Sequence, residues 1–145
     1  MLSPIQLEEH KILRIHFDTR IIEGDSAPLV FRHAITAAQQ DEQGLRWLVR
    51  LDVHFMPETD AGTAPYIGEI AVVGVFSLAA DFPKERASDM VHMNGGAILF
   101  GTARELLSSI TARGIHGAVM LPTVDARCFL PEPTSHDRTN TSEPP

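Results

Sequence analysis

The feature that most constrains the fold is the run LRWLVRLDVHF at residues 45–55, in which apolar and polar side chains alternate. This period of two is that of a β-strand with one face on a core and one face in water. The run therefore predicts a strand in a sheet that is covered on one side. The inward set comprises Leu45, Trp47, Val49, Leu51, Val53 and Phe55.

Three other segments are predicted to complete the sheet. Residues 5–22 alternate in the same way, and residues 66–80 are apolar on both faces, as in a strand covered on both sides or facing a partner. The last apolar segment, residues 118–130, is interpreted as a fourth strand at an edge because Pro122 interrupts it. Residues 23–44 are interpreted as a long crossover, since they begin with turn-forming residues.

A helix is predicted to begin at Ala97. Its apolar residues recur at spacings of three and four, which is the pattern of an amphipathic helix. Pro83–Met93 is expected to be a helical or looped lead-in, Asn94 to cap the helix, and Gly114 to end it in the left-handed conformation. The order of elements predicts an α+β fold in which one long amphipathic helix packs on a four-stranded antiparallel sheet.

Composition limits the function. The net charge is −7, with 19 acidic against 12 basic residues, and it argues against nucleic acid as a partner. No run of about 20 apolar residues could span a bilayer, and the amino terminus lacks the pattern of a signal peptide, so we expect a cytoplasmic protein without membrane insertion. The single cysteine, Cys128, is expected to be a buried thiol. Residues 1–130 are expected to form one domain, and the polar residues 131–145 a disordered tail.

Motifs for chemistry are scarce. The histidines and Cys128 show no metal-ligand spacing, and no nucleophile or phosphate-loop motif is present, so we expect no metal, no cofactor and no enzyme. Arg50, Asp52 and His54 share a strand face, a common arrangement on solvated strands. The stretch HMNGGAILFGTA superficially resembles the helix start of hot-dog thioesterases, where Asn94 would polarise a thioester carbonyl. That fold needs several strands after its helix, and only one fits after Gly114.

Four blocks of the chain resemble the SecB export chaperone family in the right order. They are APLVF at residues 27–31, GVFSLAA at 74–80, AILFGTARELLSSITARG at 97–114 and VMLPTVDA at 119–126. The resemblance implies a sheet-and-helix protomer that forms dimers edge to edge and then a tetramer through its helices. It further implies an ATP-independent holdase that binds unfolded polypeptides, such as secretory preproteins, in apolar grooves and delivers them to the translocase ATPase SecA.

The resemblance also implies site residues. The client groove would comprise Leu29, Val30, Phe31, Ile35, Phe76, Leu78, Ile98, Leu99 and Phe100. Docking of the translocase would use Asp18, Glu23 and Glu69, and the oligomer would form through Ala103, Leu106, Leu107 and Ile110 on the helix.

Two departures from the family leave an alternative open. Gly101 and Thr102 replace the family's Pro-Tyr, and the polar tail stands where the family has a second amphipathic helix. The alternative is a dedicated SecB-like chaperone that guards the antitoxin of a toxin–antitoxin pair.

Overall fold

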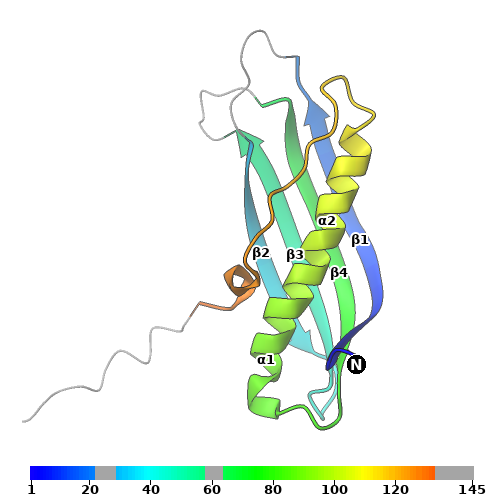
Figure 1. Cartoon of the computed structure of the whole chain (residues 1–145), viewed down its shortest axis with the longest axis vertical. Helices are drawn as coiled ribbons and strands as arrows, with labels where there is room; N and C mark the ends of the chain where they lie inside the picture. Colours follow the sequence, from blue (N-terminus) through cyan, green and yellow to red (C-terminus); the bar gives the residue numbers. More distant parts are fainter. Residues whose placement is uncertain (22–28, 58–63, 133–145) are drawn as a thin grey trace, which may run out of the picture.

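The computed structural model describes residues 1–21, 29–57 and 64–132. Four antiparallel strands form one sheet in the order β1-β4-β3-β2 (Figure 1). The strands are β1 (Ile5–Thr19), β2 (Leu29–Gln39), β3 (Arg46–Pro57) and β4 (Tyr66–Leu78). The predicted α+β class, with a four-stranded antiparallel sheet and one long helix, is confirmed.

One strand was predicted in the wrong place. Residues 29–39, expected within a crossover, form β2 and pair with β3 from Leu29 opposite Pro57 to Gln39 opposite Trp47. The alternation in β2 is hidden because His33 stands on the helix side between Phe31 and Ile35, while alanines stand on the outer side. The turn into β3 is fixed by Asp41, whose Oδ1 accepts hydrogen bonds from two backbone N–H groups, and by Gly44 at φ 72°.

The expected fourth strand, residues 118–130, lies outside the sheet. It runs back along the helix as an extended segment and ends in the short 3₁₀ helix η3 (Ala126–Phe129) (Figure 1). Pro122 has no N–H group to give to a sheet, and the apolar side chains turn toward the helix and β2 instead. We call residues 118–130 the strap. Cys128 in the strap is exposed, contrary to the buried thiol expected.

The helix begins earlier than predicted. The elements η1 (Lys84–Arg86), α1 (Ala87–Met90), the π-helical turn η2 (Val91–Gly95) and α2 (Gly96–Thr111) follow one another directly. Asn94 therefore lies inside helical backbone, where its Nδ2 donates to the Met90 carbonyl at 3.3 Å, and it caps nothing. Gly114 is also not left-handed: the described glycines with positive φ are Gly44 and Gly117.

Gly114 is needed for space. A Cβ at this position would collide with the hydroxyl of Tyr66, which is fully buried. That hydroxyl donates to the Gly117 carbonyl at 3.1 Å and so joins β4 to the turn after α2. A glycine is therefore required after the helix, as predicted, but the reason is close packing against the ring of Tyr66 and not a left-handed backbone.

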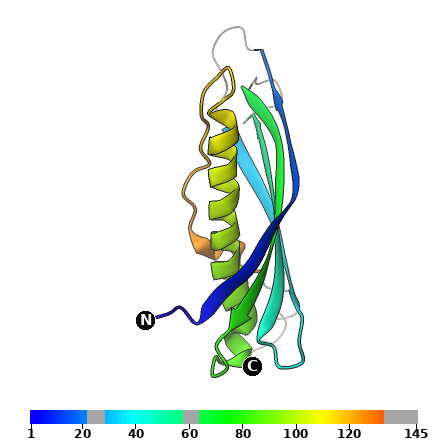
Figure 2. The same ribbon diagram turned by 90° about the vertical axis from the view of Figure 1, so that its right-hand side faces the viewer.

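The core lies between α2 and one face of the sheet, while the other face carries no helix (Figure 2). On β3 the residues Val49, Leu51, Val53 and Phe55 are at most 1% exposed, which confirms the alternation read from this strand. From the helix, Leu99, Ala103 and Leu107 complete the core. β4 is apolar on both faces although only its helix side is covered, and Ile67, Val73 and Val75 are half-buried on its outer face between β1 and β3.

Candidate functional site

An aromatic and aliphatic surface lies where β2 meets α2. Phe31 of β2 and Phe100 of α2 stack with ring centroids 5.3 Å apart, and Ile35 lies on the same side of β2. Leu29, Phe31 and Ile35 are half-buried on the helix side of β2, whereas Val30, which was predicted to join them, is half-buried on the outer side because side chains alternate along a strand. We call this surface, which is formed by Leu29, Phe31, Ile35 and Phe100 and covered in part by residues 118–130, the β2–α2 groove.

The strap lies in this groove. The ring of Phe129 is fully buried, 5.8 Å from the ring of Phe100 and 5.0 Å from that of His33. The carbonyl of Cys128 lies 3.1 Å from His33 Nε2, and Asp125 caps η3 by accepting from the N–H of Arg127. The guanidinium of Arg127 beside Asp125 lowers the pKa of that carboxyl to about 2.

Several residues predicted for the groove lie elsewhere. Phe76 and Leu99 are fully buried and Leu78 nearly so, all in the core between helix and sheet. Phe100 is 4% exposed, because Phe31 and Phe129 cover its ring. Ile98 points the other way and is 38% exposed on the outer side of α2. The spacing of apolar residues predicted β1, β3 and α2 correctly. It could not predict which of the apolar side chains are covered and which are accessible.

The residues predicted to join helices divide in the same way. Ala103 and Leu107 are buried against the sheet of their own protomer, whereas Leu106 and Ile110 are half-buried at the sides of α2. The exposed side of α2 consists of Ile98, Gly101, Glu105 and Ser109.

The outer face of the sheet carries the predicted docking acids. Glu69 on β4 accepts a hydrogen bond from Arg14 Nη1 at 2.8 Å and faces His54 Nδ1 at 3.4 Å, and Arg14 lowers the pKa of this carboxyl. Asp18 lies 3.8 Å from His16 Nε2. Glu23 lies outside the described residues.

The charges of this face are interleaved. Arg50 holds Asp52 through two hydrogen bonds of 2.8 and 2.9 Å, and Lys11 and Arg46 pair with Glu9 and Glu8. On this face the described acidic side chains named above therefore each lie beside a basic side chain or a histidine, in solvent-exposed pairs.

The edge strand β1 exposes apolar side chains that the sequence reading did not single out. Ile12, Leu13 and Ile15 are 46%, 51% and 38% exposed. Leu13 is an extra residue at a register shift against β4, and Ile12 and Ile15, which pair with Val72 and Ile70, lie on the helix side of the sheet. The sequence shows β1 as a run of alternating apolar and polar residues. This pattern does not tell how far its apolar side chains are buried.

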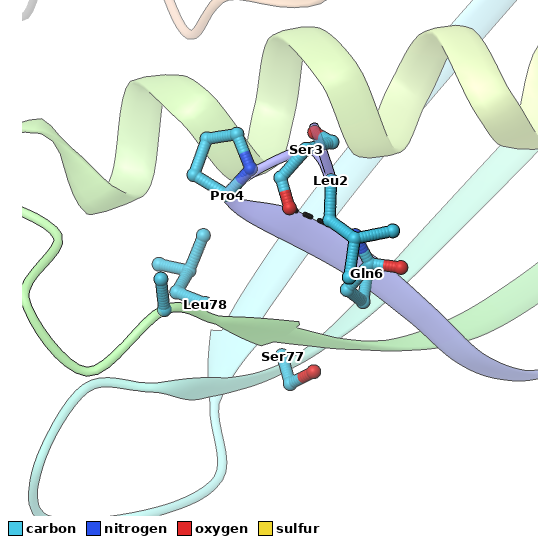
Figure 3. A pocket seen from close by; sticks show the side chains of 7 residues that line it. Leu2, Ser3, Pro4, Gln6, Ser77 and Leu78 are labelled. Carbon is cyan, nitrogen blue, oxygen red and sulfur yellow. Dashed lines mark hydrogen bonds between the residues drawn. The ribbon is translucent and has the colours of Figure 1, made fainter.

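The described surface has several open hollows, and the one of about 260 Å³ on the outer face of the sheet is lined by residues that include His16, Asp18, His54 and Glu69. Another of about 430 Å³ lies between the amino terminus and the end of β4, and its lining residues, including Pro4, Gln6 and Leu78, have no titratable side chain (Figure 3). Within residues 1–21, 29–57 and 64–132, no three His, Cys, Asp or Glu side chains are placed to hold a metal ion. No helix in the described part of the chain has the length and apolar character to cross a membrane.

Fold and surface together define a class: a small α+β protomer with an apolar groove and no recognisable reaction centre in its described part. The family model described as preprotein translocase subunit SecB matches residues 19–130, and the chain belongs to this family of chaperones. Among curated protein sequences none matches it.

Two solved structures share the fold. One is the SecB-like chaperone Rv1957 of Mycobacterium tuberculosis in complex with a ChAD peptide from the HigA1 antitoxin. It is 16% identical with a TM-score of 0.58, over 83% of this chain and 91% of that one. The other is a protein of unknown function from Streptococcus agalactiae, 18% identical with a TM-score of 0.52, over 82% of this chain and 97% of that one.

Proposed function

We propose that this chain is an ATP-independent holdase that binds extended, unfolded polypeptide segments in the β2–α2 groove. The observation that carries the proposal is the set of half-buried apolar side chains on the edge strand β2, Leu29, Phe31 and Ile35, which packs beside Phe100 in a chain of the SecB family. Half-buried aromatic and aliphatic side chains in a row offer an apolar surface to a chain that has lost its own core. Binding and release then need no nucleotide.

The proposed assembly is a homotetramer built as a dimer of dimers in the cytoplasm. Edge pairing through β1 would cover Ile12, Leu13 and Ile15, which are exposed in the protomer. The exposed side of α2, with Ile98 and Gly101, would then contact the helices of a second dimer. Grooves of neighbouring protomers would join into longer tracks for one client chain.

The client is the finer question. Delivery to SecA would need Glu69 and its neighbours to be available, but Glu69 is held by Arg14 and His54. A dedicated client is therefore the second candidate, and a solved SecB-like chaperone with an antitoxin peptide shows that the fold accommodates one. Co-purification from the native host separates the two: many secretory precursors support general export, and a single antitoxin supports dedicated duty.

A third possibility, thioester hydrolysis at Asn94, is disfavoured. Asn94 lies inside helical backbone and bonds the Met90 carbonyl, so its amide does not stand at a helix start where a thioester could meet free N–H groups. Acyl-CoA hydrolysis that disappears in Asn94→Ala would overturn the chaperone proposal.

The direct test is binding of a permanently unfolded probe. Reduced, carboxymethylated α-lactalbumin labelled with fluorescein should bind the full chain without ATP, and native α-lactalbumin should not. Phe31→Ser should weaken binding by about tenfold, because one well-packed aromatic contact corresponds to roughly 1.4 kcal/mol or more.

The matched control for this variant is Ala34→Ser on the same strand. Ala34 is exposed on the outer face, so its replacement should leave binding unchanged. Equal affinity of wild type and Phe31→Ser, with both folded by circular dichroism, would remove the groove from the proposal.

A further inference from the structure

We infer that the strap is an internal occupant of the client site: the β2–α2 groove holds residues 119–129 of its own chain as it would hold a client, and a client binds by displacing them. This inference rests on the proposed holdase function and goes further, since it names what closes the groove and which kind of segment opens it. The groove would select an extended segment whose apolar residues are spaced like Val119, Leu121 and Val124 and which ends in an aromatic residue.

The strap is held as a bound peptide is held. Its backbone is extended yet makes no ladder with β2 in the described structure; its backbone–backbone hydrogen bonds are the local ones within η3, made by the N–H groups of Cys128 and Leu130. At the other end, Val119 N–H donates to Thr111 Oγ1 at 2.8 Å. Between these ends, side chains alone fasten the segment.

Four side chains of the strap face the groove, at sequence spacings of two, three and five. Val119, Leu121, Val124 and Phe129 turn inward, with Leu121 and Phe129 at most 1% exposed. Met120, between two of them, is 61% exposed, although its Sδ lies 3.1 Å from Arg104 Nη2. An unrelated chain with the same spacing of apolar residues could make the same contacts, because no residue-specific backbone pairing is involved.

The aromatic end of the strap sits in a notch formed by a glycine. A Cβ at Gly96 would lie 2.6 Å from Phe129 Cγ and 2.9 Å from Ile35 Cδ1, so only glycine leaves room for the ring. Phe100 and His33 close the notch from two sides. This is the feature that would give a client with Phe, Tyr or Trp at this point its advantage.

Because strap and client compete, the apparent affinity for a client is reduced by the fraction of molecules with an open groove. Loosening the strap should therefore raise affinity, whereas damage to a simple core segment would lower it. The opposite signs make the inference testable with the full chain.

The probe is a fluorescein-labelled peptide with the sequence of residues 117–131, in which Ser replaces the cysteine. Phe129→Ala in the full chain should bind this peptide about tenfold more tightly than wild type, since the competing segment has lost its aromatic anchor. Met120→Ala, at the exposed neighbouring position, should bind like wild type. A peptide with Ala in place of its Phe should bind Phe129→Ala no more tightly than it binds wild type. Folded Phe129→Ala that binds no more tightly than wild type would overturn the inference.

A second measurement uses wild-type protein, in case Phe129→Ala does not fold. The amide of Val119 at the start of the strap donates to Thr111 Oγ1 at 2.8 Å. Displacement of the strap should break this hydrogen bond and speed hydrogen–deuterium exchange of the Val119 amide about threefold when carboxymethylated α-lactalbumin binds. Bound probe with an unchanged rate would contradict displacement of the strap, while a probe that does not bind would contradict the holdase proposal itself.

Discussion

Gly96 and Phe129 share one volume: the absence of a side chain at the start of α2 admits the ring at the end of the strap, and a Cβ there would lie 2.6 Å from Phe129 Cγ. Gly96 and Phe129 are 33 positions apart in the sequence, and the space left by the first residue is filled by the ring of the second. Gly96 belongs to the stretch HMNGGAILFGTA that resembles the helix start of thioesterases, and here this glycine makes room for a packed side chain.

The match between these residues can be measured as a coupling. Gly96→Ala alone should destabilise the chain by about 1–3 kcal/mol through overpacking, and Phe129→Ala alone by about 3–5 kcal/mol. In the double variant the alanine at 96 should cost nothing further, because the ring it would strike is gone. Urea unfolding of all four proteins checks this, and additive effects would contradict the shared volume.

Two other glycines form a matched pair for stability. Gly114→Ala should destabilise the chain by about 1–3 kcal/mol, because its Cβ meets the hydroxyl of the buried Tyr66. Gly101→Ala should stabilise it by about 0.5–1 kcal/mol, since that position is helical, exposed and open. Thermal melts of the two variants should shift in opposite directions, and a shift of the same sign in both would refute the packing role of Gly114.

The helix α2 separates a core side from an outer side, and substitution should reveal both. Leu107→Ala should cost about 2–5 kcal/mol of stability because Leu107 is buried on the sheet. Ile98→Ser should change stability by less than about 1 kcal/mol, since 38% of Ile98 is exposed. If α2 joins protomers, Ile98→Ser should lower the mass measured by light scattering. An unchanged oligomer would exclude Ile98 from the contact.

The ion pair between Arg14 and Glu69 should be visible in a titration. Arg14 lowers the pKa of the Glu69 carboxyl, so this pair contributes to stability above the ordinary pKa of a glutamate and loses the contribution as the pH falls through the lowered value. Arg14→Met should raise the pKa of Glu69 toward 4.5 in a ¹³C NMR titration. Arg127→Met, which acts on Asp125 in the strap, is the control. An unmoved Glu69 titration would mean that the pair does not persist in solution.

The sequence foretold the elements whose pattern is regular. β3 alternates cleanly between core and solvent, and both of its ends were predicted to within two residues. α2 has apolar residues at helical spacing, and its first residue was predicted to within one position. The strand order was not predicted, because β2 was taken for a crossover and the strap for a strand. β2 was missed because His33 interrupts its inward apolar set, and a histidine that packs edge-on against Phe129 looks polar in a sequence.

The candidate site was foreseen only in part. Phe31, Ile35 and Phe100 do come together, but periodicity could not tell that Phe76 and Leu99 face the covered side of the sheet. The strap was predicted to be a strand because it is a short apolar segment, and an extended peptide in a groove can have the same composition. The distinction depends on hydrogen-bond partners, and those are set by tertiary structure.

The central claim is that this chain holds unfolded polypeptides without a nucleotide, and suppression of aggregation measures it most directly. Light scattering of chemically denatured citrate synthase, diluted into buffer with increasing amounts of the full chain and no ATP, should fall until the chaperone is roughly equimolar in binding sites. Phe31→Ser should need several times more protein for the same effect, and Ala34→Ser should match wild type. Scattering that stays unchanged at a large excess of folded wild-type chain would contradict the account.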